Sequence, residues 1–453
     1  MTKNLMTSVS GIRGIVGESL TPDVIVKYVS AFGQRLAGKK VVVGGDPRGS
    51  SEFIRSLVKG TLRAAGCHVI DIGVSPTPTV EIMTKHLGAG GGIAITASHN
   101  PIQWNGLKFI GKDGMFLPER EVFSLFKEAE AKKRTYKNWE QLGSEEHYPD
   151  AIDDHLKLIY QLPYLNIETI RKRKFKVVLD CVNGAGASII PRLLKEFGCQ
   201  VIGLNTELTG VFAHEPEPIP QNLVELAVAV KKEKADLGLA VDPDADRLAM
   251  ISNEGNPLGE EYTLALAVKF VLSKKLGYVV VNLSTSRVID DIVQYYNVLL
   301  FKTKVGEINV SQRMQEVEAI IGGEGNGGVI LPEVHPGRDA ATGVALILQF
   351  LAESGGTLSQ LKQSLPQYYI LKDKEDIKNI DPDKVIEHFS EKYSDEQLDL
   401  TDGLRIDRAD SWIHLRKSNT EPIVRIIVES RTPEISWRIL QEVKEEIQKL
   451  SKS

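Results

Sequence analysis

The sequence predicts an α/β protein with three similar mixed α/β domains and a smaller C-terminal α+β domain. Two observations lead to this prediction. A chain of 453 residues is too long for one ordinary hydrophobic core. Along most of it, a short apolar run, a turn containing Gly or Asp and an amphipathic stretch follow one another repeatedly. This order is typical of alternating strands and helices.

The first copy of the pattern begins at residues 41–43, where three consecutive valines indicate a buried strand. Residues 44–50 then form a turn rich in Gly, Asp and Pro. A helix is expected from about residue 52 to residue 65, and a second strand over 69–72.

The second copy begins at residues 176–180, Lys-Val-Val-Leu-Asp, which predict a strand. A turn at 183–186, Asn-Gly-Ala-Gly, leads into a helix toward Phe197 and a strand over 200–202. The two glycines indicate a tight strand-to-helix turn, because the segment is not a full dinucleotide-binding fingerprint.

The third copy runs from a strand at 278–281 through a turn at 284–287 into a helix that ends near Tyr296. Beyond about residue 370 the pattern changes. A charged segment is followed by strands near 412–415 and 423–428 and by a closing helix rich in Glu and Lys. This order predicts a small α+β domain. The expected domains are residues 1–149, 150–253, 254–368 and 369–453.

The composition excludes several classes of protein. With 60 acidic and 55 basic residues the net charge is -5, which argues against a general nucleic-acid surface. The three cysteines lack metal-ligand spacing and are expected to be reduced. The chain begins without an apolar signal stretch, and no apolar run is long enough to span a bilayer. We therefore expect a cytoplasmic protein, either a monomer or a homodimer, with no membrane partner.

The acidic loop, residues 242–247, follows an apolar run that reads as a strand. Asp242, Asp244 and Asp246 occupy alternate positions, so an extended chain points all three to one side. Like charges at this spacing repel unless a cation lies among them, and oxygen ligands favour magnesium or calcium. An EF-hand is excluded, because it needs Gly and Glu where Arg247 and Asn253 stand.

The serine loop, residues 96–101, has the sequence Thr-Ala-Ser-His-Asn-Pro and follows an apolar strand. The loop can present the Ser98 hydroxyl, or it can be an ordinary turn, since Ser, Asn and Pro are all turn residues. A serine hydrolase is disfavoured because the chain here lacks G-x-S-x-G and the adjacent Ser98 and His99 would point in different directions. We expect His99 to be structural or a hydrogen-bond partner.

Two further loops can bind oxyanions or hydroxyl groups. The polar loop, residues 416–422, combines a guanidinium, two hydroxyls, an amide and backbone N–H groups, a composition that suits a phosphate dianion. The alternative is a polar turn between strands. The glycine loop, residues 322–328, is flexible enough for close backbone approach and carries one carboxylate and one amide, from Glu324 and Asn326.

These four loops, TASHNP, DPDADR, GEGNGG and RKSNTEP, resemble in sequence and order those of the α-D-phosphohexomutase family, which includes phosphoglucomutases, phosphomannomutases and phosphoglucosamine mutases. The resemblance spans essentially the whole chain. Residues 10–14, Ser-Gly-Ile-Arg-Gly, and 105–108, Asn-Gly-Leu-Lys, also match family positions. The resemblance implies four domains around a central cleft, each contributing one loop.

The resemblance also implies roles for individual residues. Ser98 would carry a phosphate, and that phosphate together with the three aspartates would ligate one magnesium ion. Arg13 and Lys108 would lie near the reacting oxygens, as electrostatic partners or proton carriers, and Arg247 would steady the phosphate or the metal loop. His99 is a further candidate catalytic residue. The implied substrate-binding residues are Lys304, Gly306, Glu324, Asn326, Arg416, Ser418, Asn419, Thr420 and Arg425.

The implied reaction interconverts a hexose 1-phosphate and a hexose 6-phosphate. Phospho-Ser98 would donate its phosphoryl group to the sugar, which gives a hexose 1,6-bisphosphate. This bisphosphate, which is also the activator, would rotate end over end in the site and return its other phosphate to Ser98. Many relatives have GExSGH in the third loop, whereas Asn326 and Gly328 stand here. His335 is a candidate substitute for that histidine or a structural loop residue. Glucosamine phosphate is the favoured substrate, with mannose or glucose phosphate as alternatives.

Two other functions fit some of the same residues. Asp-x-Asp after an apolar strand also begins the site of magnesium-dependent phosphatases, with Asp242 as nucleophile. Those sites usually have Thr or Val where Asp246 stands. A non-catalytic sugar-phosphate sensor is the second alternative, and the intact serine and complete set of aspartates argue against it.

Overall fold

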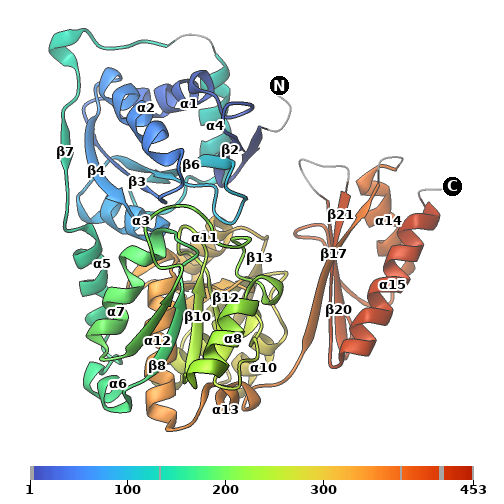
Figure 1. The fold of residues 1–453 in the computed structure, drawn as a ribbon. Helices are drawn as coiled ribbons and strands as arrows, with labels where there is room; N and C mark the ends of the chain where they lie inside the picture. Colours follow the sequence, from blue (N-terminus) through green and yellow to red (C-terminus); the bar gives the residue numbers. More distant parts are fainter. Residues whose placement is uncertain (1–4, 132–133, 378–379, 418–422, 451–453) are drawn as a thin grey trace.

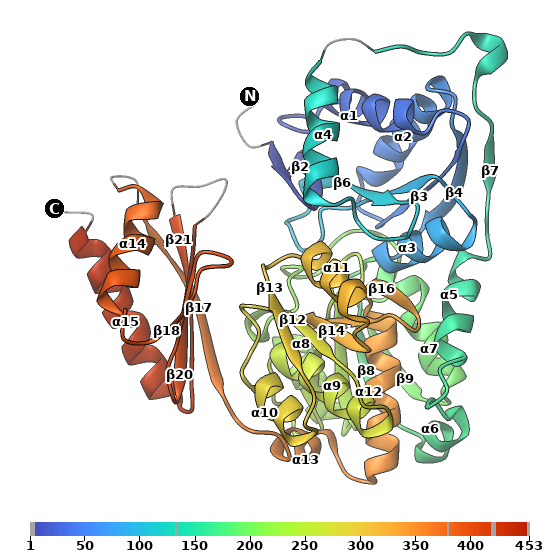
Figure 2. The same ribbon diagram turned by 180° about the vertical axis from the view of Figure 1, so that it is seen from behind.

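The computed structural model describes residues 5–131, 134–377, 380–417 and 423–450. Its strands form four separate sheets, one in each successive part of the chain. In Figure 1 the first domain lies above the second and third, and the C-terminal domain stands to one side; Figure 2 shows the same arrangement from behind. The predicted four-domain α/β architecture is confirmed.

The first domain has a seven-stranded mixed sheet in the order β1-β2-β6-β5-β3-β4-β7. Alternate valines of β3 face opposite sides: Val41 and Val43 pack with α1, α2 and α4, whereas Val42 packs with α3. Its elements are β1 (Met6–Ser8), β2 (Gly11–Ile15), α1 (Pro22–Arg35), β3 (Lys40–Gly45), α2 (Ser51–Ala64), β4 (His68–Val74), α3 (Thr77–His86), β5 (Gly91–Ile95), β6 (Trp104–Gly111), α4 (Glu119–Glu130), the 3₁₀ turn η1 (Trp139–Gln141) and β7 (Glu145–His147).

The second domain has a four-stranded sheet in the order β11-β10-β8-β9, with β10, β8 and β9 parallel. The helix predicted to run toward Phe197 starts later than expected, because a 3₁₀ turn follows Gly184 and Pro191 marks the first turn of α7. Its elements are α5 (Ala151–Tyr160), α6 (Ile167–Arg173), β8 (Lys176–Asp180), η2 (Ala185–Ser188), α7 (Ile190–Glu196), β9 (Gln200–Leu204), η3 (Pro220–Asn222), α8 (Val224–Glu233), β10 (Leu237–Val241) and β11 (Leu248–Ser252).

The third domain has a five-stranded sheet in the order β13-β12-β14-β15-β16, in which β12 is parallel to both of its neighbours. Its elements are α9 (Glu261–Lys274), β12 (Val279–Asn282), α10 (Val288–Tyr295), β13 (Leu300–Thr303), α11 (Glu307–Val317), β14 (Ile321–Glu324), β15 (Gly328–Leu331), β16 (His335–Arg338), α12 (Ala340–Ser354) and α13 (Leu358–Gln363).

The C-terminal domain is an antiparallel sheet, β17-β21-β20-β19-β18, with helices packed on it. Its hydrophobic core is separate from those of the other domains, and β17 connects it to the third domain. Its elements are β17 (Tyr369–Asp376), α14 (Pro382–Lys392), β18 (Gln397–Asp399), β19 (Leu404–Asp407), β20 (Ser411–Lys417), β21 (Ile423–Ser430) and α15 (Pro433–Leu450).

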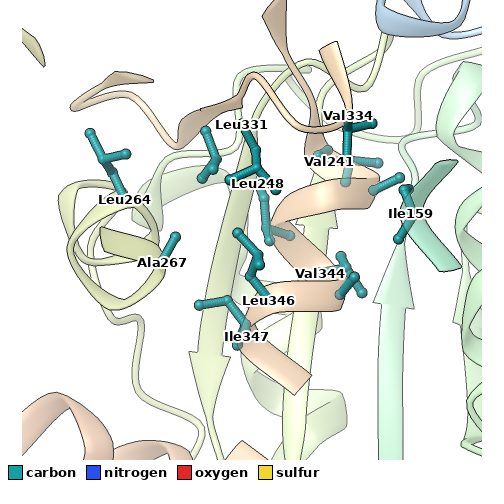
Figure 3. Packing of buried hydrophobic residues seen from close by; sticks show 14 of the residues in the cluster. Ile159, Val241, Leu248, Leu264, Ala267, Leu331, Val334, Val344, Leu346 and Ile347 are labelled. Carbon is teal, nitrogen blue, oxygen red and sulfur yellow. The ribbon is translucent and has the colours of Figure 1, made fainter. Parts of the chain in front are cut away.

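The second and third domains share one hydrophobic core, which also includes the side of the first domain's sheet that faces α3. Helix α12, buried along nearly its whole length, contacts α9 and β15 of its own domain and also β11, α6 and α7 of the second domain. Figure 3 shows Val344, Leu346 and Ile347 of this helix packed among side chains of both domains. Because close-packed interiors resist deformation, the loops at the ends of β10 and β14 are held in fixed relation to each other.

None of the described helices combines the length and the apolar content needed to cross a bilayer.

Candidate active site

Ser98 lies in the loop between β5 and β6, and its side chain is buried. Its backbone has a φ of +51°, a left-handed conformation that is uncommon for a residue other than glycine. The Ser98 N–H donates to Oγ1 of Thr96 at 2.8 Å, and the Ser98 hydroxyl donates to Oδ2 of Asp242 at 3.2 Å. The serine and acidic loops, predicted from separate parts of the sequence, therefore meet.

Arg48, which the sequence analysis did not single out, holds the serine loop in this conformation. Its side chain is fully buried and pairs through Nε with Oδ2 of Asp46 at 2.9 Å. Its terminal nitrogens donate to backbone carbonyl oxygens of the loop, those of Ser98, Asn100, Pro101 and Trp104. One rigid guanidinium thus fixes the backbone on both sides of the serine.

The acidic triplet, Asp242, Asp244 and Asp246, follows β10 and is completely buried. One carboxylate oxygen from each residue lies within 4.8 Å of the others, so the three could hold a metal ion. Ala245 between them has a φ of +53°, and a Cβ on Gly184 would lie 2.7 Å from the backbone of Pro243. The glycine turn after β8 therefore provides the space that this loop needs.

In Asp244 and Asp246, one carboxylate oxygen accepts hydrogen bonds and the other accepts none from the described residues; the second oxygen of Asp246 lies 3.9 Å from Nε of Arg247. Oδ2 of Asp244 accepts from Lys108 Nζ and from the Thr77 hydroxyl, both at 2.6 Å. Oδ2 of Asp246 accepts from Arg338 at 2.6 Å and from Lys108 at 3.3 Å. The Oδ1 atoms of both are buried and lack a hydrogen-bond partner among the described residues. Unpartnered buried carboxylate oxygens are costly unless a cation binds them.

The pKa shifts around the acidic triplet also indicate that a cation would stabilise it. Burial, together with repulsion from Asp246 and Asp244, raises the pKa of Asp242 well above its ordinary value. Burial also opposes ionisation of Asp244, but Lys108 and Thr77 hold its pKa below the ordinary range. Burial lowers the pKa of Lys108, but Asp244 and Asp246 raise it by more. The pKa is therefore raised overall, and Lys108 stays charged. A hard divalent cation bound by oxygen would relieve the remaining repulsion.

The glycine loop packs directly on the acidic loop. Gly327 has a φ of +89°, its carbonyl accepts from the Leu248 N–H at 3.0 Å, and a Cβ there would lie 2.4 Å from Leu248 O. Glu324 is buried at the start of this loop. Its Oε1 accepts from Asn282 at 2.8 Å and from the Gly306 N–H at 2.9 Å. Asn326 is half-buried and accepts the N–H of Gly328 through Oδ1.

Arg338 is the second buried arginine that the sequence analysis did not identify as a site residue. Nη2 contacts Asp246, Nη1 donates to Oε2 of Glu324 at 2.8 Å, and Nε donates to Oε2 of Glu307 at 2.9 Å. The guanidinium therefore joins the acidic loop of the second domain to the glycine loop of the third. The acidic partners raise its pKa against the opposing effect of burial.

Three of the predicted site residues, Arg13, His99 and Arg247, contact the serine loop or Glu217. Arg13 donates to Oδ1 of Asn100 at 3.2 Å. Arg247 pairs with Glu217 at 3.1 Å, and His99 lies 3.4 Å from the Ser98 hydroxyl and 3.8 Å from Glu217. The charge of Arg247 and burial lower the pKa of His99 well below its ordinary value, so the imidazole is neutral. Glu217 is a further cleft residue that the sequence analysis missed.

The described part of the polar loop brings like charges together. Arg416 on β20 is the cross-strand partner of Arg425 on β21, and Lys374 on β17 pairs with Arg425 from the other side. Like charges directly opposite one another destabilise a sheet unless an anion lies between them. Ser418, Asn419 and Thr420 lie outside the described residues. Lys304 is exposed just after β13, two residues before the Gly306 that contacts Glu324.

Sequence profiles of the four domains of phosphoglucomutase/phosphomannomutase match this chain in order. They cover residues 5–135, 153–255 and 259–369 for the three alpha/beta/alpha domains, and 371–446 for the C-terminal domain.

The chain belongs to the phosphoglucomutase/phosphomannomutase family.

Relatives of the mutase match it over nearly their full length. It is 38% identical to a phosphoglucomutase/phosphomannomutase of Thermococcus kodakarensis, over 95% of this chain and 96% of the relative. It is 33% identical to a phosphoglucosamine/phosphogalactosamine mutase of Sulfurisphaera tokodaii, over 96% and 97%. A protein of Methanopyrus kandleri named "Probable phosphoglucosamine mutase" is 37% identical over 94% of each chain.

Solved structures of similar fold cover the whole chain. A family protein of Burkholderia thailandensis, 27% identical, superposes with a TM-score of 0.85 over 99% of this chain and 98% of its own. The N-acetylphosphoglucosamine mutase of Aspergillus fumigatus, solved with GlcNAc-6P and magnesium, superposes with a TM-score of 0.59 at 15% identity, over 98% and 95%. The resemblance inferred from the loops is confirmed, and the mutase is an isomerase of the phosphohexomutase class.

The hydrogen bond and the carboxylate contact of His335 are made with Gly337 on its own strand and with Glu81 of the first domain. His335 is buried, its Nδ1 accepts the Gly337 N–H at 3.1 Å, and it lies 3.7 Å from Glu81 of the first domain. Burial lowers the pKa of His335 to about 4. These contacts favour a structural role.

Proposed function

We propose that this mutase interconverts the 1- and 6-phosphates of glucosamine through phospho-Ser98 and an enzyme-bound bisphosphate. The observation that carries the proposal is the 3.2 Å contact between the Ser98 hydroxyl and Asp242, beside the unpartnered oxygens of Asp244 and Asp246. A phosphate on Ser98 would lie next to three carboxylates, an arrangement that is favourable only with a cation between them.

Magnesium is the cation that these residues suit. Asp242, Asp244 and Asp246 would hold it together with the Ser98 phosphate, and the unpartnered buried oxygens are the observation that fits such an ion. When bound, magnesium neutralises charge on the transferring phosphoryl group. Two of these carboxylates are oriented by hydrogen bonds to their other oxygen. Thr77 and Lys108 donate to Asp244, and Arg338 donates to Asp246.

The chain's own residues account for the transfer step. The bond between phosphorus and Ser98 Oγ breaks, a bond to the sugar hydroxyl oxygen forms, and the hydroxyl proton ends on Ser98. Arg13, Lys108 and Arg247 supply fixed positive charge around this position, and such positioned charge provides most of the acceleration in phosphoryl transfer. The raised pKa of Lys108 makes it an electrostatic partner rather than a base.

The phosphate that is not being transferred would be held by the polar loop. Arg416 and Arg425 face each other across β20 and β21, and Ser418, Asn419 and Thr420 complete the proposed cradle. Glu324 and Asn326 would contact sugar hydroxyls, with Lys304 and Gly306 beside them. The proposal keeps the domain division at residues 149, 253 and 368.

Support for glucosamine phosphate comes from two directions. Relatives from Methanopyrus kandleri and Sulfurisphaera tokodaii carry phosphoglucosamine mutase names. The glycine loop GEGNGG and the segment VGEINV, residues 305–310, also resemble a bacterial branch of the family that is usually assigned to glucosamine phosphate.

The test is a side-by-side assay with glucosamine, mannose and glucose 6-phosphates, using magnesium and the matching 1,6-bisphosphate as activator. We expect isomerised product from all three with the highest kcat/KM for glucosamine phosphate, and one phosphate per chain on Ser98 by mass spectrometry. Ser98→Ala should abolish turnover. Release of free phosphate without isomerised product would instead favour the phosphatase, and full activity of Ser98→Ala would exclude the mechanism.

A further inference from the structure

Asp402 connects the C-terminal domain to the third domain at the polar loop. It lies in the tight turn between β18 and β19. Its Oδ2 lies 2.9 Å from Nε of Arg416, and the same oxygen accepts the Val305 N–H of the third domain at 2.9 Å. One carboxylate therefore contacts the arginine that begins the polar loop and the backbone between Lys304 and Gly306.

The turn that carries Asp402 is itself fixed. Gly403 has a φ of +78°, and a Cβ there would lie 2.2 Å from the Leu415 carbonyl oxygen, so the turn lies directly on β20. The carbonyl of Asp402 can only accept, so Nε2 of His414 donates to it at 2.7 Å. Burial lowers the pKa of His414 to about 4, and its other nitrogen, Nδ1, then accepts from the Ser284 hydroxyl at 3.0 Å. Ser284 belongs to the third domain.

A continuous set of contacts runs from Asp402 to the acidic triplet. Gly306, next to Val305, donates its N–H to Glu324, and Glu324 accepts from Arg338 through its other oxygen. Arg338 then donates to Asp246. The arginine proposed to hold the distant phosphate is thus joined, through Asp402 and the third domain, to the residues proposed to hold the metal.

The C-terminal domain is joined to the third domain by less hydrophobic packing than joins the second and third domains to each other. Its hydrophobic core is separate, whereas the second and third domains share one. Polar contacts such as those of Asp402 therefore contribute much of what fixes its position. Interfaces of this polar kind open more readily than hydrophobic ones.

We propose that Asp402 is a positioning residue that orients Arg416 and holds the C-terminal domain against residues 304–306, so that the bisphosphate stays bound between the two transfers. This inference rests on the proposed function, in which the intermediate must present each phosphate to Ser98 in turn. A carboxylate suits the position because it carries charge for Arg416 and accepts from Val305 with one atom.

The test measures escape of the intermediate. Enzyme carrying ³²P on Ser98 is mixed with excess unlabelled hexose 1-phosphate, and the label is divided by chromatography between monophosphate product and free hexose 1,6-bisphosphate. Asp402→Asn keeps an acceptor for Val305 but loses the charge, and Asp402→Ala loses both. Asp410→Asn, an exposed aspartate of the neighbouring turn, is the matched control.

We expect Asp402→Ala to raise the fraction of label released as bisphosphate by about tenfold and Asp402→Asn by a smaller factor, with the control unchanged. The ³²P content of Ser98 and the affinity for Mg²⁺ should stay as in the unmodified enzyme, which a general folding defect would not allow. An unchanged released fraction in a folded Asp402→Asn or Asp402→Ala variant would overturn the inference. If the unmodified enzyme transfers no label from Ser98 to the sugar, either as monophosphate product or as bisphosphate, the proposed function fails instead.

Discussion

The Nη2 atom of Arg338 lies 2.6 Å from Oδ2 of Asp246, across 92 residues of sequence and between two domains. The same guanidinium donates to Glu324 at 2.8 Å. The residue proposed to bind metal and the residue proposed to bind sugar therefore share one buried cation. Orientation of either carboxylate depends on the other through Arg338.

We expect Arg338→Lys to lower kcat/KM by about 100-fold, because an ammonium cannot contact Asp246, Glu324 and Glu307 in the geometry of the planar guanidinium. The apparent Mg²⁺ affinity should fall at the same time, measured by titration of activity and by calorimetry. Arg313→Lys, an exposed arginine on α11, is the control and should be neutral. Lowered activity with unchanged Mg²⁺ affinity would contradict a role in orienting Asp246.

Replacement of Arg48 should disturb Ser98 without touching the substrate. We expect Arg48→Lys to reduce phosphate incorporation at Ser98 and kcat by at least tenfold, because the forked donors to the serine loop are lost. A lysine cannot keep the contact with Asp46 together with those to the loop, so the buried pair is disrupted as well, and the free energy of unfolding should fall by about 3 kcal/mol. The measurements are intact-mass spectrometry and urea denaturation. Arg35→Lys on α1, which alters a partly exposed ion pair with Glu128, is the control. If Arg48→Lys is destabilised but Ser98 is phosphorylated normally, Arg48 stabilises the fold and does not position Ser98 for phosphorylation.

Replacing Asp242 should raise the thermal stability of the metal-free protein and reduce the stabilisation that Mg²⁺ gives. Burial and the neighbouring Asp246 and Asp244 disfavour the ionised form of Asp242, so the metal-free parent loses stability by burying or protonating this carboxyl. Asp242→Asn removes that cost, and we expect the metal-free variant to unfold at a higher temperature than the metal-free parent. Its rise in Tm on adding Mg²⁺ should be smaller, because a ligand is lost. Differential scanning fluorimetry with EDTA or Mg²⁺ tests both, and Asp153→Asn at an exposed site serves as control. An equal Mg²⁺ effect in variant and parent would exclude Asp242 as a ligand.

Stability should also depend on pH through Glu261. Burial raises the pKa of Glu261 from 4.5 to about 8, although Lys372 opposes the shift. Between these values the folded protein binds more protons than the unfolded chain. The free energy of unfolding therefore falls as pH rises from about 4.5 to about 8. Glu261→Gln should flatten this slope in denaturation at several pH values, and Glu254→Gln, an exposed neighbour, should not.

Much of the fold and of the site could be predicted from local sequence. The strand at residues 176–180 is β8 as expected, and the strand predicted at 69–72 lies within β4. Both are short apolar runs bounded by turn residues, so their signals are local. Alternation likewise placed the three aspartates on one side of the acidic loop, and the structure brings their oxygens within 4.8 Å.

The four loops, their order and the family could be recognised from the sequence alone, because each loop is a short stretch whose residue types indicate its chemistry. The side chains that support those loops could be identified only from the packing of the domains. Arg48, Arg338 and Asp402 act through contacts made when separate domains pack, and an isolated Arg or Asp in sequence carries no sign of its distant partner. A buried charge is recognisable only once the burial and the partner are both known.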